Sequence, residues 1–177
     1  MYYTNHYGSP LGDITMASDG EMLTGLWFEG QRYFAATLPA DHAEKDLELF
    51  ITVKLWLDKY FDGKEPDFTP PLYPQATDFR RLVYDILMTV PYGCTTTYSH
   101  VAEKVAKKRG IVSISARPVG NAIAHNPISI IIPCHRVIGS DGSLTGYAGG
   151  IDKKITFLKL EGAYKNEYFI PKHSTAP

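Results

Sequence analysis

The chain is divided by a proline-rich stretch, 63-GKEPDFTPPLYPQAT-77, which decides its domain organisation. Every proline lacks the amide hydrogen that a helix interior or a central strand would use. The stretch contains four of them: Pro66, Pro70, Pro71 and Pro74. We therefore expect an extended linker over residues 62–77, at the end of an N-terminal domain (residues 1–77). A C-terminal domain follows at residues 78–177.

The formal charge changes sign at this linker. The whole chain has 18 basic and 19 acidic side chains, a net charge of -1. Residues 1–77 hold five bases and twelve acids (net -7), whereas residues 78–177 hold thirteen bases and seven acids (net +6). Such an asymmetry suits a C-terminal domain that meets an acidic partner such as nucleic acid, although two differently solvated faces would give the same counts.

Composition excludes several classes of protein. With 44% hydrophobic and 21% charged residues, the chain is typical of globular proteins and unlike disordered, collagen-like or coiled-coil chains. Two cysteines exclude a disulfide scaffold, and no CxxC pair indicates a zinc site. The start, MYYTNHYGSP, lacks the features of a signal peptide, and the longest apolar run is too short to cross a bilayer. We expect a soluble cytoplasmic protein without a metal or cofactor.

The N-terminal domain is predicted to combine a small sheet with one helix. Turn-forming pairs separate three strand-like runs, Met1–Tyr7, Leu11–Ala17 and Met22–Phe28, which favours an antiparallel meander. Apolar residues then recur at helical spacing over Glu44–Phe61, and Asp62-Gly63 ends the pattern.

The C-terminal domain is predicted to be mostly helical. One helix begins at Thr77 or Asp78, a second spans Tyr98–Lys108, a third runs from about Ser115 to the residues before Asn126, and a last one spans Ile151–Leu160. The second and third, joined by a compact turn, are typical of a helix-turn-helix. The predicted fold class is therefore α+β.

The densest chemical signal is the run IIIPCHRV at residues 130–137. A buried cysteine is ordinarily an inert hydrophobic residue. Here His135 and Arg136 adjoin Cys134, and such neighbours favour the nucleophilic thiolate. A cysteine–histidine pair by itself fits either a structural or a catalytic role.

The residues around this run resemble the O6-alkylguanine-DNA alkyltransferases. The PCHRV motif is accompanied in the right order by Tyr98, by Arg117 and Gly120, by Asn126-Pro127, by GYAGG at 146–150 and by LKLEG at 158–162. The resemblance covers about residues 75–170, and the N-terminal half fits in layout only. Spaced motifs in one order are more specific than a single pattern.

The resemblance implies a reaction that each molecule performs once. Cys134 would accept the alkyl group from O6 of guanine, and also from O4 of thymine, in DNA. His135 would deprotonate Cys134 through a water, Glu161 would orient His135, and Asn126 would act as a hinge that ties its turn to the cysteine segment. Without the resemblance, Glu161 reads as a solvated helix-end acid and Asn126 as a helix stop.

The resemblance also implies that the target nucleotide is flipped out of the duplex from the minor groove. Arg117 would fill the gap that the base leaves, and the small residues Gly120 and Ala122 would let the helix approach the groove. Independently, residues 98–126 carry five bases against one acid, a net charge of +4. Among these bases, phosphate contacts are expected from three lysines: Lys104, Lys107 and Lys108.

A pocket for the flipped base would be formed by Tyr98 with the loop residues Tyr147, Ala148 and Gly149. Main-chain donors in this loop would stabilise charge that develops on the leaving oxygen. Some relatives carry serine at the position of Ala148, so this chain lacks that hydroxyl, and its preference among alkyl groups stays open.

The partner implied is alkylated double-stranded DNA, bound by a monomer. Two other functions are compatible with parts of the pattern: a non-catalytic helix-turn-helix DNA-binding module, and a thiol hydrolase that uses Cys134 and His135. Neither alternative requires all four of the residues Arg117, Asn126, Tyr147 and Glu161.

Overall fold

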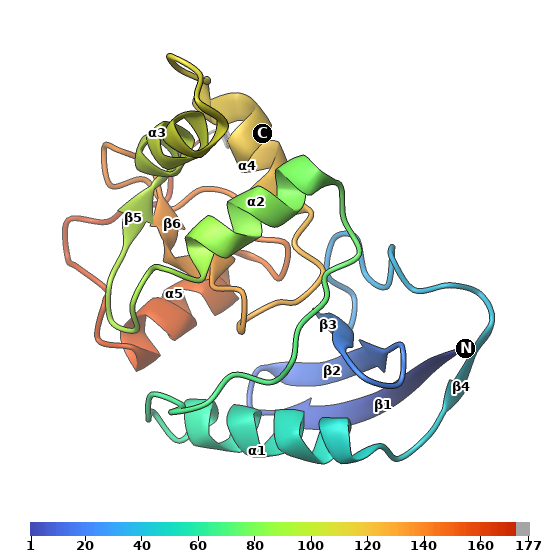
Figure 1. Cartoon of the computed structure of the whole chain (residues 1–177). Coiled ribbons are helices and arrows are strands. Elements are labelled where there is room, and N and C mark those ends of the chain that lie inside the picture. Colours follow the sequence, from blue (N-terminus) through green and yellow to red (C-terminus); the bar gives the residue numbers. More distant parts are fainter. Residues whose placement is uncertain (173–177) are drawn as a thin grey trace. The chain divides into compact units, whose positions relative to one another are not determined.

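The computed structural model describes residues 1–172, which form two compact units. One comprises Met1–Gln75 with Pro127–Ile131, and the other comprises Ala76–Asn126 with Ile132–Pro177, of which the last described residue is Lys172. The predicted α+β class is confirmed, with a small sheet in the first unit and mainly helices in the second (Figure 1). Residues 127–131, which the sequence analysis assigned to the C-terminal domain, belong to the first unit.

A four-stranded sheet and one helix make up the first unit. Its elements are β1 (Tyr2–Ser9), β2 (Gly12–Ser18), β3 (Leu23–Phe28), β4 (His42–Glu44) and α1 (Glu48–Phe61). The strand order is β3-β2-β1-β4, in which β1, β2 and β3 are antiparallel neighbours and β4 runs parallel to β1. The expected helix therefore starts later than Glu44, because residues 42–44 pair with the edge of β1 instead. Figure 1 shows α1 lying along this sheet.

The sheet depends on a glycine at which an aromatic ring takes the place of a side chain. A Cβ atom added to Gly25 in β3 would overlap the indole ring of Trp27. Trp27 lies two residues further on the same face of the strand, and it is only 1% exposed. Its ring therefore fills the position that a larger residue at 25 would occupy.

The outer edge of β3 is covered by two extended segments. The Leu23 amide donates to Pro71 O (2.8 Å) and the Tyr73 amide donates to Leu23 O (2.8 Å), so part of the proline-rich stretch pairs with the strand. Further along, Leu26 N–H donates to Pro127 O (2.8 Å) and Ser129 N–H donates to Leu26 O (2.9 Å). These bonds satisfy backbone groups that an open edge would expose.

Four α-helices dominate the second unit. They are α2 (Asp78–Leu87), α3 (Tyr98–Arg109), α4 (Ala116–Ala124) and α5 (Ile151–Leu160). The first three pack against one another, and residues 110–115 connect α3 to α4 as the turn of the expected two-helix motif (Figure 1). Thr77 Oγ1 accepts a bond from Arg80 N–H (3.3 Å) and Thr97 Oγ1 accepts one from His100 N–H (3.1 Å), which caps α2 and α3.

The segment that contains Cys134 is held by short elements that were not predicted from the sequence. The 3₁₀ turn η1 (Cys134–Arg136) leads into β6 (Val137–Ile138), which pairs in parallel with β5 (Thr96–Thr97). Because β5 leads directly into α3, this pairing brings the start of α3 beside η1. The last helix anchors the arrangement through a buried cluster that contains Ile138, Leu144, Leu158, Ala163 and Tyr168.

Within residues 1–172, none of the helices combines the length and the apolar character needed to span a bilayer.

Candidate active site

Cys134 begins the 3₁₀ turn η1, and its side chain is 5% exposed. The apolar residues before it are buried as well, since Ile131 is 4% and Ile132 is 2% exposed. Burial raises the pKa of the Cys134 thiol, and this effect exceeds the opposing influence of the Asn126 hydrogen bond and the Lys154 charge. The thiol is therefore protonated at neutral pH and needs a base to become a nucleophile.

Asn126 joins the two ends of the loop that precedes the cysteine. Its Nδ2 donates to Ile132 O (2.9 Å) and to Cys134 Sγ (3.2 Å), and the residue is buried. Between these ends, Ile130 adopts a φ of 68°, a conformation that strains a β-branched residue. The structure thus brings Asn126 to Cys134, as the sequence predicted, and shows a strained loop that the sequence did not indicate.

His135 and Glu161 form a buried pair beside the cysteine. His135 Nε2 lies 2.6 Å from Glu161 Oε1, and neither side chain has solvent exposure. Since an ionised carboxylate only accepts hydrogen bonds, Nε2 carries the proton of the neutral imidazole, and Nδ1 is the nitrogen with the acceptor lone pair.

Arg136 and a backbone amide hold the carboxylate from its other sides. Arg136 Nε donates to Glu161 Oε2 (2.8 Å), Nη2 donates to Oε1 (3.1 Å), and Gly93 N–H donates to Oε2 (3.3 Å). Arg136 Nη1 is itself fixed by Val90 O at 2.6 Å. From the sequence, Arg136 was expected only as a neighbour of the cysteine, and its pairing with Glu161 was not predicted.

These contacts define the charge state of the pair. Burial alone would raise the pKa of Glu161, but its bonds and charge interactions with His135 and Arg136 outweigh burial and lower that pKa to about 2. Burial lowers the pKa of His135 below its ordinary value, despite the opposing effect of Glu161. The site therefore combines a neutral imidazole with an ionised carboxylate at neutral pH, which is the pairing that a general base requires.

A buried lysine completes the site and was missed by the sequence analysis. Lys154 in α5 is 0% exposed, and its Nζ donates to Val137 O (2.5 Å) and Thr145 O (2.8 Å). Burial lowers its pKa to about 8, while the nearby Cys134 acts in the opposite direction. A lysine within an amphipathic helix ordinarily reaches solvent, so its spacing alone carried no signal.

Tyr98 shares one acceptor with this lysine. Its hydroxyl donates to Thr145 O at 3.0 Å, and Lys154 Nζ lies 6.0 Å from the centre of its ring. Burial raises the pKa of Tyr98 to about 12, so the phenol stays protonated at neutral pH.

The loop residues Tyr147, Ala148 and Gly149 are half-buried and lie next to the histidine. The Tyr147 ring packs edge-on against His135 (centroids 6.5 Å apart) and Phe157 (6.0 Å). A Cβ atom at Gly149 would approach Tyr147 Cε1 to 2.8 Å, so a glycine allows the ring to lie over the loop backbone. The predicted loop thus does lie at the site.

The predicted DNA-contacting residues divide into two groups. Arg117, Lys107 and Lys108 are exposed and Lys104 is half-exposed, so all four can reach a partner. Gly120 and Ala122 are buried instead, and Ala122 O accepts a bond from Tyr84 of α2 (3.1 Å). Small residues there allow close packing of α4 within the unit, and the part of this pair in the approach to DNA stays a prediction.

Comparisons with known proteins match both parts of the chain. Residues 78–163 match the family model of the DNA-binding domain of 6-O-methylguanine DNA methyltransferase, and residues 1–74 match that of its ribonuclease-like domain. A methylated-DNA–protein-cysteine methyltransferase of Haemophilus influenzae is 39% identical over 91% of this chain and 86% of its own length. One of Methanosarcina barkeri is 44% identical over 91% of this chain and 97% of its own.

Solved structures agree in fold. The crystal structure of Mycobacterium tuberculosis O6-methylguanine methyltransferase superposes with a TM-score of 0.78 at 39% identity, covering 92% of this chain and 94% of that one. A crystal structure of the Mycobacterium tuberculosis protein in complex with DNA gives a TM-score of 0.77 at 39% identity, covering 92% of both chains.

Proposed function

The chain belongs to the 6-O-methylguanine DNA methyltransferase family, and we propose that it repairs DNA by moving an alkyl group from O6 of guanine to Sγ of Cys134. The observation that carries this proposal is the contact of Cys134 Sγ with Asn126, beside the buried His135–Glu161 pair. A thiol, its base and an orienting carboxylate are the components of an activated nucleophile.

The reaction is a single displacement. The thiol proton passes to Nδ1 of His135 through a bridging water, and the resulting thiolate attacks the alkyl carbon in line with the bond to O6. An S–C bond forms as the C–O bond breaks, the electron pair stays with the guanine, and the guanine takes up one proton. Because a thioether is a poor leaving group, the protein is consumed after one transfer.

The base must leave the duplex to reach a thiol that is 5% exposed. We infer that the nucleotide is flipped out from the minor groove side and that Arg117, which is exposed at the start of α4, fills the gap. Phosphate contacts come from Lys107 and Lys108, with Lys104 in support, and these contacts carry no sequence information.

The flipped base is held between Tyr98 and the loop of Tyr147, Ala148 and Gly149. Tyr98 remains a hydrogen-bond donor at neutral pH, because burial raises its pKa to about 12. Amides of the loop stabilise the charge that develops on O6. A thymine alkylated at O4 presents the same alkyl–oxygen bond and is included as a second substrate.

Transfer of labelled methyl groups from duplex DNA containing O6-methylguanine tests the proposal. We expect the label on Cys134, with at most one methyl group per chain and no transfer in Cys134→Ala. DNA binding without any transfer would instead support a binding module, and repeated turnover of an ester without DNA affinity would support a thiol hydrolase.

A further inference from the structure

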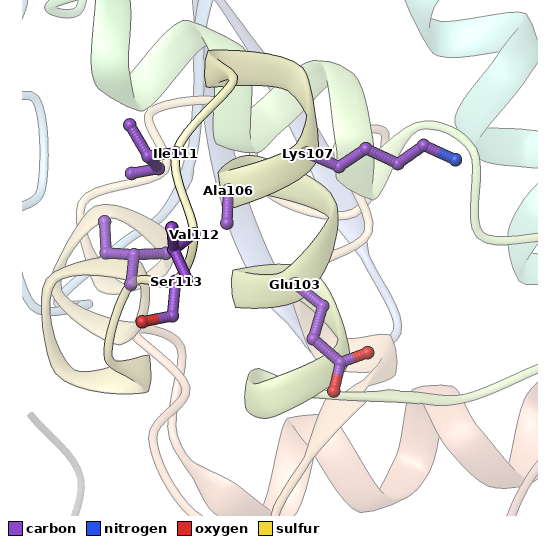
Figure 2. Close-up of a pocket in the computed structure, with 7 residues that line it drawn as sticks. Glu103, Ala106, Lys107, Ile111, Val112 and Ser113 are labelled. Carbon is purple, nitrogen blue, oxygen red and sulfur yellow. The ribbon is translucent and has the colours of Figure 1, made fainter.

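The turn between α3 and α4 presents apolar side chains where a surface residue is ordinarily polar. Val112 is fully exposed and Ile111 is 42% exposed, and both are β-branched. Together with Ala106 and Ser113 they line a shallow hollow of about 320 Å³ (Figure 2). Exposing these side chains gains nothing for the folded unit, because apolar groups stabilise a fold only when they leave water.

A fixed backbone holds the turn in this position. Gly110 ends α3 with a φ of 65°, the Ile111 amide donates to Ala106 O (3.1 Å), and the Gly110 amide donates to Lys107 O (3.3 Å). This pair of bonds is the Schellman motif, which fixes the backbone at the end of α3. The turn therefore presents Val112 at its tip as a defined feature of the helix end.

The surroundings of the turn are strongly basic. The last turn of α3 carries Lys107, Lys108 and Arg109, and Arg117 follows in the first turn of α4. In Figure 2 the side chain of Lys107, which also lines the hollow, extends away from the apolar turn, so charged and apolar groups lie side by side. An occupant of this surface must combine negative charge with an apolar face.

Duplex DNA has this combination at the edge of its minor groove, where deoxyribose rings lie between phosphates. Proteins that bind this groove commonly pair arginine and lysine with apolar side chains. The hollow is also lined by Glu103 and Lys107, whose opposite charges leave it without a net positive charge that would select a phosphate. An uncharged sugar fits there better than a phosphate does.

We propose that Val112 and Ile111 form an apolar contact with deoxyribose at the minor groove edge, next to the phosphate contacts of the basic residues. This inference rests on the proposed function, since it assigns a second, uncharged component to the same DNA-binding surface. It separates the free energy of DNA binding into a salt-dependent part from lysine and arginine and a salt-independent part from the turn.

Binding of unmodified duplex DNA by the full chain, measured by fluorescence anisotropy over a range of salt concentrations, tests the contact. Removing the Val112 side chain in Val112→Ser should raise the dissociation constant about 3- to 10-fold at every salt concentration, because an apolar contact releases no counterions. Lys108→Gln should instead reduce the slope of log K against log salt by about one. Ile51→Ser, which replaces an apolar residue that is 58% exposed in α1, is the matched control and should bind as the wild type does.

Val112→Thr provides a second variant that keeps the shape of the side chain, and a smaller loss of affinity is expected from it. Thermal unfolding verifies that each variant is folded. An unchanged dissociation constant in Val112→Ser, or a loss that comes with a lower salt slope, would overturn the proposal. If wild-type chain still transfers methyl groups from O6-methylguanine DNA in that case, the apolar contact alone has failed. If the wild type binds duplex DNA without transfer, the proposed function has failed. The apolar contact is then judged by the dissociation constant of Val112→Ser alone.

Discussion

At the scale of single residues, Glu161 is unusual because its carboxylate is both buried and ionised. Its two oxygens receive bonds from His135, Arg136 and Gly93, so its ionised form is fully compensated. We predict that Glu161→Gln lowers the single-turnover rate of methyl transfer by about 10²-fold, because the imidazole loses the charge that stabilises its protonated state. Glu167→Gln, which changes an exposed acid of the same unit, is the control and should react at the wild-type rate.

The pH dependence of transfer follows from the same pair. Burial lowers the pKa of His135 below 6.5, so the imidazole is already neutral and able to accept a proton at neutral pH. The rate should rise with pH below the ordinary histidine pKa of about 6.5 and level off near neutrality. A rise confined to the range above about 8.5, where a free thiol titrates, would show that Cys134 ionises without His135.

Lys154 is predicted to position the site by joining two carbonyls from different segments. Lys154→Met keeps the apolar stem but leaves Val137 O and Thr145 O without this donor. We expect the transfer rate to fall at least tenfold, about 1.4 kcal/mol in activation free energy, with the chain still folded. Lys159→Met, which changes an exposed lysine in the last turn of α5, should have no such effect, and equal rates in both variants would contradict the role of Lys154.

The chemical role of a residue was predictable from the sequence only where the residue belongs to a recognisable motif. The contacts of Cys134, His135, Asn126 and Glu161 were expected through the resemblance. Lys154 gave no signal, because its burial depends on carbonyls at 137 and 145 that only the fold assembles. Gly120 and Ala122 left two roles open, since small residues serve equally for close approach to DNA and for packing between helices.

At the scale of elements, periodicity and turn residues predicted the strands β1 to β3 and the helices closely, except for the start of α1, which lies at Glu48 and not at Glu44. Helix α5 has the predicted bounds, Ile151–Leu160, because Gly150 and Gly162 flank a clear apolar pattern. The strands β4, β5 and β6 were missed, since two or three residues cannot show an alternation. Their pairing depends on partners distant in sequence, and that information is absent from a local pattern.

The packing of Trp27 over Gly25 makes a prediction for strand β3. Gly25→Ala should destabilise the first unit by more than about 2 kcal/mol, because the new methyl group forces the buried indole out of its place. Gly8→Ala in β1 is the matched control, since its Cβ would meet Asp13 Oδ1 at an ordinary 3.8 Å. Denaturant unfolding of both variants measures the difference, and similar losses in the two would contradict the packing argument.

At the scale of the whole molecule, the near-neutral charge of -1 conceals an acidic first part and a basic second part. The net charge of +4 over residues 98–126, which include α3 and α4, accounts for affinity towards DNA better than the total charge does. The total charge of -1 would by itself argue against a nucleic-acid partner, because the acidic first part cancels the basic second part.

Acid should destabilise the molecule in two steps. The folded pKa of His135 lies below 6.5, so the unfolded chain binds this proton first and stability begins to fall as the pH drops below about 6.5. Glu161 has a folded pKa of about 2 against an ordinary 4.5, so the stabilisation that its ionised form provides is complete above pH 4.5 and is lost towards pH 2. Hydrogen exchange of the α5 amides measures this dependence, which should be flatter in Glu161→Gln. Parallel profiles for wild type and variant would argue against the ionised carboxylate.

The central claim is that Cys134 accepts one alkyl group from DNA, and intact-mass measurement after incubation with O6-methylguanine duplex tests it most directly. The chain contains a second, exposed thiol, Cys94, which serves as an internal comparison for reactivity without the site. We predict a mass increase of a single methyl transfer that stops at one per chain and maps to Cys134. Transfer to Cys94, repeated turnover, or an unmodified mass after binding of the lesion would contradict the account.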